Sequence, residues 1–143
     1  MQIKRQADYA VRAIMYLAEL APNEKAATSQ IAKEQDIPLS FLAKIIAQLS
    51  VAGLLQTMRG ARGGVTLART PKEINLLEVV EAIDGPILLN ECVNGGHECS
   101  IKSCVMRKIW RDAQEDLVNR LESTNFGDLI KQSRCSLSIL HSS

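Results

Sequence analysis

The sequence of 143 residues predicts a mainly α-helical protein with one small β-hairpin. Three observations lead to this fold class. Apolar residues recur at helical spacing in several separate segments. Hydrophobic residues make up 46% of the chain but aromatic residues only 3%, which favours helices packed through Ala, Leu, Ile and Val over a β-sandwich or barrel. One glycine-rich turn, over residues 60–64, lies between two short β-prone segments.

The first two helices are predicted from apolar spacing and from the breaks that follow them. Four apolar residues lie along one face of residues 7–21: Ala10, Ile14, Leu17 and Ala21. Pro22 ends this helix. Thr28 is expected to be the N-cap of a short second helix, which the stretch DIP at residues 36–38 breaks.

A third helix and a hairpin complete a winged helix-turn-helix domain. The stretch LSFLAKIIAQLSV has apolar residues at i, i+3, i+4 and i+7: Leu42, Ile45, Ile46 and Leu49. Gly53 is expected to end this helix. Its opposite face is small or basic: Ser40, Ala43, Lys44 and Ala47. The segment LLQTMRGARGGVTLAR, residues 54–69, predicts the hairpin, or wing, and the order of elements matches a winged helix-turn-helix.

The rest of the chain predicts a cysteine-rich loop and a helical arm. Residues 75–78 resemble a capping box that opens a helix ending before Gly85. A helix over about residues 104–122 carries an apolar stripe so wide that it needs a partner, most simply the same helix of a second protomer. We expect four parts: a winged helix-turn-helix domain (residues 1–84), a cysteine-rich loop (85–104), a dimerisation helix with a short following helix (105–130) and a tail (131–143).

The charge distribution indicates double-stranded promoter DNA as a partner, although the formal net charge is only +1. No Asp or Glu occurs from residue 37 to residue 72, whereas five basic residues do: Lys44, Arg59, Arg62, Arg69 and Lys72. Because phosphate binding depends on Lys and Arg charge, this acid-free window predicts a basic DNA-binding face. Taken alone, such a run indicates only a solvated face, so the prediction depends on its place in the helix order.

Eight residues are expected to contact DNA: Ser40 and Lys44 on the third helix, Thr28, Ser29 and Gln30 at the start of the second, and Arg59, Gly60 and Arg62 at the hairpin tip. The third helix is expected to face the major groove. Hydroxyls and backbone N–H groups at the start of a helix bind phosphate. An arginine on a thin glycine-rich hairpin can enter the minor groove. The alternative for the tip is a flexible turn without a DNA role.

Three cysteines lie in the stretch CVNGGHECSIKSC with spacing C-x6-C-x4-C: Cys92, Cys99 and Cys104. The N-terminal segment lacks the apolar core of a signal peptide, so we expect a cytoplasmic protein whose thiols stay reduced and bind metal. Zinc sites favour tight C-x2-4-C pairs, whereas looser spacing suits a cluster whose irons lie apart. The spacing therefore favours an iron–sulfur cluster over zinc, and a disulfide with a spare thiol is a further alternative.

The chain resembles the Rrf-type winged-helix transcription regulators, the family of the IscR-like and NsrR-like iron–sulfur cluster regulators. Five stretches carry the resemblance: ADYAVRAIMYLA, IPLSFLAKIIAQLSVAGLLQTMRGARGGVTLAR, INLLEVVEAIDGP, the cysteine loop and IWRDAQEDL. It implies a homodimer that binds palindromic promoter sites and holds a labile cluster, 4Fe-4S or 2Fe-2S. The cluster ligands that it implies are Cys92, Cys99 and Cys104.

A fourth ligand follows from the resemblance alone. The IscR type has a histidine three residues after the last cysteine, where this chain has Arg107. The NsrR type uses an aspartate near the N-terminus that reaches across from the partner protomer, and Asp8 matches it. The alternative for Asp8 is a surface ion pair with Arg12, one helical turn later. The competing ligands are His97, Glu98 and Cys135.

The sequence thus predicts a homodimeric regulator, with repression as the expected mode, whose cluster responds to nitric oxide, redox state or iron supply. A zinc-containing or thiol-only repressor of the same fold is the first alternative, and a small redox protein is the second. No enzyme is expected, since the chain has only two histidines, no C-x-x-C pair and no phosphate loop. No apolar run reaches the length of a membrane span, so no membrane partner is expected.

Overall fold

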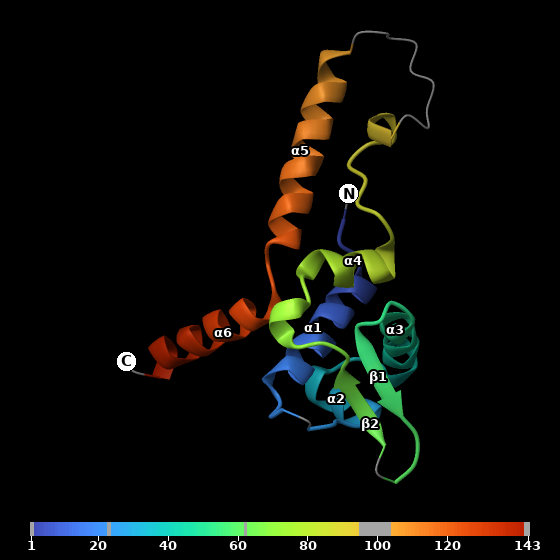
Figure 1. Ribbon diagram of the computed structural model, residues 1–143, viewed down its shortest axis with the longest axis vertical. Helices are drawn as coiled ribbons and strands as arrows, with labels where there is room; N and C mark the ends of the chain where they lie inside the picture. The colour runs from blue at the N-terminus through green and yellow to red at the C-terminus, as the bar shows by residue number, and fades with distance from the viewer. Residues whose placement is uncertain (1, 23, 62, 95–103, 142–143) are drawn as a thin grey trace.

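A computed structural model describes residues 2–22, 24–61, 63–94 and 104–141, and for residues 91, 94 and 134–141 it describes the backbone alone. The predicted fold class is confirmed: the protein is mainly helical with one two-stranded antiparallel hairpin (Figure 1). The elements in chain order are α1 (Arg5–Glu19), α2 (Thr28–Gln35), α3 (Leu39–Val51), β1 (Leu55–Met58), β2 (Gly64–Leu67), the 3-10 turn η1 (Pro71–Glu73), α4 (Leu76–Asp84), the 3-10 turn η2 (Glu91–Asn94), α5 (Val105–Glu122) and α6 (Phe126–His141).

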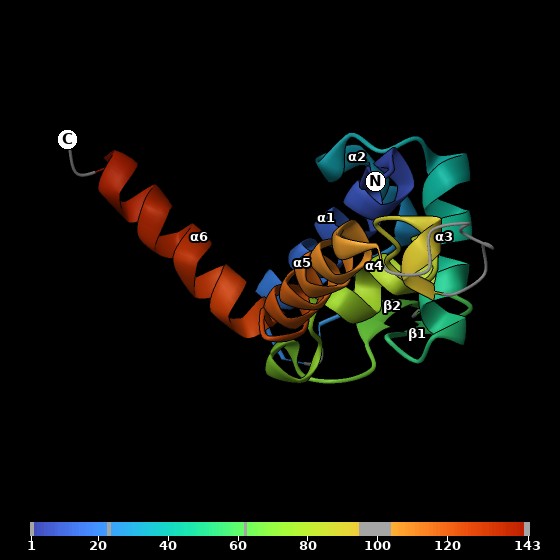
Figure 2. The same cartoon turned by 90° about the horizontal axis from the view of Figure 1, so that it is seen from above.

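Helix α1 lies at the centre of the compact part of the molecule. It contacts α2, α3, α4, α6 and β2, and Figure 2 shows these elements gathered around it. Three of the four expected apolar positions form its buried face, Ala10, Ile14 and Leu17, together with Ala7 and Ala13. The expectation for Ala21 is wrong, because the helix ends at Glu19 and Ala21 is exposed. The core around it is completed chiefly by aliphatic side chains from the other elements: Ile31, Leu42, Ile45, Leu49, Leu54, Val65, Ile74, Val79 and Phe126.

The turn between α2 and α3 is built as the sequence indicated, but α2 begins differently. Asp36 has the left-handed backbone conformation (φ 52°), and the Ile37 N–H donates to the carbonyl of Ala32 at 2.9 Å. The prediction that Thr28 is the N-cap is wrong by one residue, because the N-cap is Ala27. The cause is tertiary: Ala26 pairs with Val65 of the hairpin, so the chain stays extended up to Ala27.

Two strands form the wing, and Ala26 extends their sheet by one bridge. The register pairs Leu55 with Leu67 and Met58 with Gly64. Two glycines shape the tip: Gly60 has φ +102°, and a Cβ on Gly63 would overlap the carbonyl oxygen of Met58. The glycine-rich stretch therefore closes a tight turn that other residues do not fit.

The chain leaves this domain through α4 and returns to it after α5. The predicted capping box is confirmed: the Glu78 N–H donates to Asn75 Oδ1 at 2.9 Å, and the Asn75 N–H donates to Glu78 Oε2 at 3.1 Å. Asn125 forms an isolated bridge with Asn75, and Phe126, which is fully buried, anchors the start of α6 beneath it. Residues after 131, where the sequence offered no pattern, continue α6 as far as His141.

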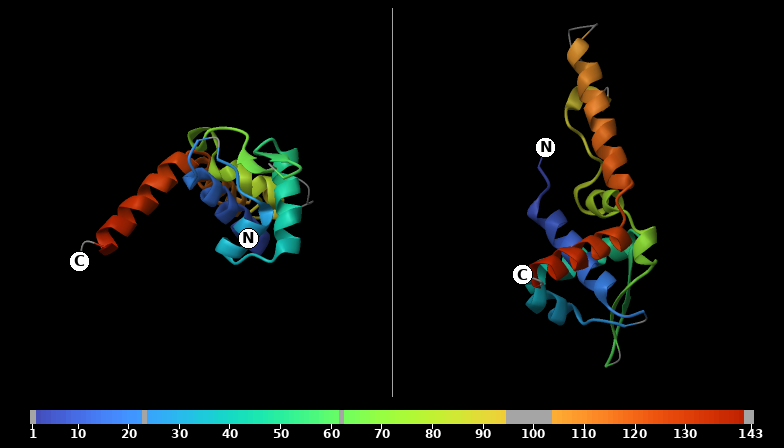
Figure 3. Two further views of the ribbon diagram at one scale, coloured as in Figure 1. Left: turned by 90° about the horizontal axis from the view of Figure 1, so that it is seen from below. Right: turned by 90° about the vertical axis from the view of Figure 1, so that its left-hand side faces the viewer.

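Helices α5 and α6 project from the compact part in different directions (Figure 3). Helix α5 has no buried residue along its 18 positions, and large apolar side chains are exposed on its first half: Val105, Met106, Ile109 and Trp110. Among the described residues, no helix combines the length and apolar character needed to cross a membrane.

Candidate nucleic-acid interface and metal centre

The outer face of α3 is open to solvent. Ser40 and Lys44 are exposed and lie one helical turn apart, while the opposite face is buried in the core. Burial of that face fixes the helix axis and thereby determines which side chains are presented outward. The two residues predicted to face the major groove therefore share the accessible face of α3.

The start of α2 has a more complex environment than its sequence suggested. Thr28 is half-buried, and Ser29 and Gln30 are exposed. The Gln30 side-chain amide donates to the hydroxyl of Tyr16 on α1 at 3.1 Å, so its orientation is fixed from outside α2. Burial, and then the Glu34 carboxylate, raise the pKa of Tyr16 above its ordinary value of 10.0, and its neutral hydroxyl accepts this hydrogen bond.

The wing tip presents two of its three predicted DNA-contacting residues in the described part of the chain. Arg59 and Gly60 are exposed, whereas Arg62 lies outside the described residues. Strand β1 contacts α3, so the hairpin lies beside this helix (Figure 1). The structure thus associates the α3 residues and the hairpin residues, which the sequence could only order along the chain.

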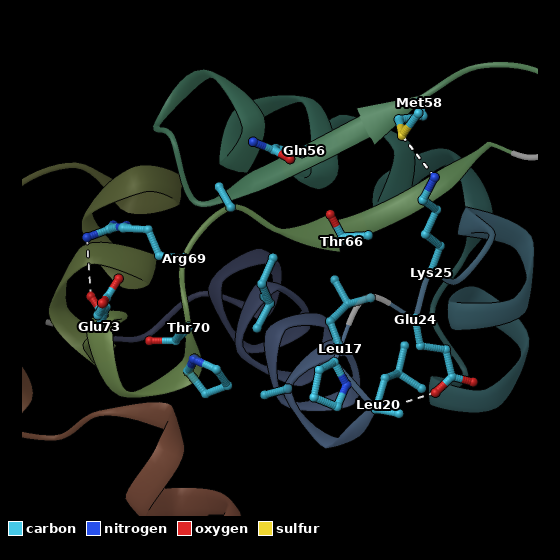
Figure 4. Close-up of a pocket in the computed structure, with 16 residues that line it drawn as sticks. Leu17, Leu20, Glu24, Lys25, Gln56, Met58, Thr66, Arg69, Thr70 and Glu73 are labelled. Carbon is cyan, nitrogen blue, oxygen red and sulfur yellow. Dashed lines mark hydrogen bonds between the residues drawn. The ribbon is translucent and has the colours of Figure 1, made fainter.

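One cation of the acid-free window is neutralised by a distant carboxylate. Arg69 at the base of the wing lies 3.0 Å from Glu78 Oε1 on α4 and also donates to the Glu73 carbonyl at 3.2 Å. These contacts border a groove of about 720 Å³ between the wing and α1, at whose other end Lys25 Nζ lies 3.0 Å from the sulfur of Met58 (Figure 4). Residues 37–72 contain no acid in the sequence, but in the folded chain the Glu78 carboxylate lies beside Arg69. This ion pair links the base of the wing to α4.

The described cysteines lie at the two ends of the loop. Cys92 is in η2 and Cys104 directly precedes α5; both are half-buried free thiols. Cys99, His97 and Glu98 lie outside the described residues, and the side chain of Cys135 in α6 is not described. Within the described part of the chain, no three His, Cys, Asp or Glu side chains form a group able to hold a metal ion.

Two contacts hold the ends of the loop against α5. Turn η2 packs on α5, and the Leu89 N–H donates to Gln114 Oε1 at 3.0 Å. One turn into α5, the side-chain Nε of Arg107 is buried without a hydrogen-bond partner among the described residues. A buried N–H without a partner is costly, so this donor marks a position where an acceptor is expected.

Asp8 lies on α1, where its carboxylate binds Arg12. Arg12 donates to Asp8 Oδ2 from Nη2 at 2.9 Å and from Nε at 3.1 Å, as the ion-pair alternative predicted. Arg12 Nη1 also donates at 3.1 Å to the carbonyl of Gln35, at the end of α2. This second contact joins Asp8 to the helix-turn-helix, and no sequence signal identified it because the two partners are 23 residues apart.

A family model described as an iron-dependent transcriptional regulator, Rrf2, matches residues 3–132. The chain belongs to the Rrf2 family. It is 32% identical over 139 residues to the HTH-type transcriptional regulator NsrR of Geobacillus kaustophilus, covering 96% of this chain and 94% of that protein.

Two solved structures of Rrf2-type regulators share the fold. The structure of CymR, titled the global cysteine regulator of B. subtilis, has a TM-score of 0.80 at 22% identity and covers 92% of this chain and 98% of that one. The structure of T. potens IscR has a TM-score of 0.76 at 23% identity, covering 93% and 88%. This Rrf2 protein is accordingly a winged-helix transcriptional regulator and not an enzyme.

We expect Lys44→Ala and Arg59→Ala each to weaken DNA binding. Each variant removes one cation from the face that meets phosphate, so the slope of log K against log salt should fall by about one. Fluorescence anisotropy over a salt series measures this slope. Lys108→Ala, which removes an exposed lysine of α5, is the matched control and should keep the wild-type slope. Wild-type slopes for Lys44→Ala and Arg59→Ala would exclude this face.

Proposed function

We propose that this Rrf2 protein is a homodimeric, iron–sulfur cluster-dependent regulator whose cluster state changes its affinity for promoter DNA. The observation that carries the proposal is the Arg12 contact between Asp8 and the carbonyl of Gln35. Asp8 is the fourth ligand that the NsrR resemblance implies, and Gln35 ends the first helix of the DNA-reading motif. The Arg12 side chain thus connects the candidate ligand Asp8 to the helix-turn-helix.

The described residues around the cysteine loop fit such a cluster. Cys92 and Cys104 are free thiols held by η2 and by the start of α5, and thiolate is a soft ligand suited to iron–sulfur clusters. Hydrogen bonds to cluster sulfur are a usual feature of these sites, and the buried Nε of Arg107 is a donor without a partner among the described residues. When bound, the cluster would supply sensitivity to nitric oxide, oxygen or iron supply.

The location of the loop supports a ligand from a second subunit. The start of α5, next to Cys104, lies at the opposite end of the molecule from the wing (Figure 1). A dimer formed through the exposed apolar face of α5 would cover Val105 and Ile109, and it would bring the loop of one chain toward another chain. The aspartate of the partner then becomes a candidate for the open ligand position.

Within one subunit, Arg12 makes the position of Asp8 and that of the α2–α3 turn depend on each other. Arg12 donates to both partners at once, and its guanidinium is planar, so a shift of one partner costs a hydrogen bond to the other. Dimeric DNA readers need their two heads at a fixed separation, so a small reorientation alters affinity. A coupling of about 1–3 kcal/mol is typical of such linkage and corresponds to a change of about 5- to 150-fold.

The decisive experiment compares anaerobically purified protein with protein stripped of iron by a chelator. We expect iron and acid-labile sulfide in the first sample, and affinities for one selected duplex that differ about 5- to 150-fold at a single salt concentration. Equal affinities would refute the switch. Zinc in place of iron and sulfide would instead identify the zinc-containing repressor.

Asp8→Ala is expected to shorten the lifetime of the cluster in air without unfolding the protein, because it removes one oxygen ligand. The decay of visible absorbance measures the lifetime, and circular dichroism reports the fold. Asp112→Ala is the matched control, since Asp112 also forms a 2.9 Å ion pair one turn from its partner on an exposed helix face. A lifetime equal to wild type in Asp8→Ala would remove Asp8 from the ligand set.

Ile109→Glu is expected to produce monomers, because a charge would have to be buried in the apolar face of α5. Light scattering coupled to size-exclusion chromatography measures the mass. Lys108→Ala on the same helix should stay dimeric, since Lys108 is exposed and pairs only with Asp112 among the described residues. A dimeric Ile109→Glu would show that α5 is not the interface.

A further inference from the structure

Two large apolar side chains are exposed at the tip of the DNA-reading helix. Leu39 and Phe41, in the first turn of α3, are 53% and 46% exposed. The core does not use them, because the buried face of this helix is already formed by other residues: Leu42, Ile45, Ile46 and Leu49. Packing in the core therefore does not explain why Leu and Phe occupy the positions on either side of Ser40.

The geometry of α3 directs these side chains toward the site where DNA is expected. Successive residues of a helix point about 100° apart, so Leu39 and Phe41 point about 200° apart and lie at the two borders of the accessible face that carries Ser40. Residues at the N-terminal end of a recognition helix are the ones that reach base edges. Lys44, one turn further, is exposed on the same side, and no carboxylate occurs in the sequence from residue 37 to residue 72. Exposed apolar side chains on the same helix as the exposed Lys44 fit a polyanion that carries apolar groups.

Only one base presents such a group in the major groove. The edges of adenine, guanine and cytosine offer hydrogen-bond donors and acceptors, whereas thymine adds its 5-methyl group. Phosphate and sugar offer no comparable apolar group beside the bases. We infer that Phe41 and Leu39 are specificity-determining residues that recognise thymine by contact with its 5-methyl group. This inference rests on the proposed function.

Val51 supplies an internal comparison. It lies on α3 and is 91% exposed, but it is the last residue of the helix rather than the first turn. Recognition by the N-terminal turn predicts that truncating Val51 leaves thymine recognition unchanged. A general preference of exposed apolar side chains for DNA predicts the same loss for all three residues.

The test begins with selection of duplexes from a random library by the full-length protein, with and without its metal. Each thymine of the best duplex is then replaced singly by deoxyuridine, which keeps every hydrogen-bonding group and removes only the methyl. We expect wild-type binding to weaken about fourfold at one or two thymines per half-site, the effect of uncovering one methyl group. In Phe41→Ala or Leu39→Ala this penalty should vanish at the thymine concerned, and in Val51→Ala it should persist.

The outcomes separate this inference from the proposed function. Specific binding without any deoxyuridine penalty overturns thymine reading and leaves the regulator intact. A penalty that persists in both Phe41→Ala and Leu39→Ala assigns the methyl to another residue and also overturns the inference. Failure to select any duplex in either metal state refutes DNA regulation itself. Circular dichroism and thermal melting of each variant establish that a lost penalty does not come from unfolding.

Discussion

The packing of helix α1 is the constraint on which the other features depend. Its buried face of small and aliphatic side chains contacts the helix-turn-helix, the hairpin strand β2, α4 and α6. The winged helix-turn-helix domain and the C-terminal helix α6 are therefore both packed against α1. Its exposed side carries Asp8 and Arg12, which the same packing holds beside the end of α2. Because packed interiors resist compression, a displacement of α1 would be passed to the elements packed against it.

Electrostatics divides the basic residues of the chain into two groups with different tasks. Arg69 is occupied by Glu78 and the Glu73 carbonyl, and Arg12 is occupied by Asp8 and the Gln35 carbonyl. These arginines hold elements together. Lys44 and Arg59 are exposed, and no ion pair to either is found among the described residues. A net charge of +1 thus conceals two environments: arginines that are paired within the fold, and exposed cations that we propose bind DNA.

The exposed arm is the basis of the proposed dimer. Helix α5 leaves all its apolar residues partly or fully accessible, although the bridge between Asn75 and Asn125 and the buried Phe126 attach the chain after it to the domain. Cys92 in η2 and Cys104 before α5 lie at the free end of this arm. The second subunit that we propose would cover the exposed apolar surface of α5 and would offer a further ligand to the proposed cluster.

The sequence by itself determined the features that depend on neighbouring residues. Periodic apolar positions predicted α1, α3 and α5, the Asn75–Glu78 capping box predicted the start of α4, and glycines predicted the wing turn. The cluster ligands, three cysteines from type and spacing and Asp8 from a resemblance, stay predictions. Only the tertiary structure decided the contacts between distant residues: the bridge from Ala26 to Val65 that moved the α2 cap, the neutralisation of Arg69 by Glu78, and the donation from Arg12 to Gln35. The reason is that a helix or a turn is selected by interactions within a few positions, whereas these pairs meet only after separate elements have packed on α1.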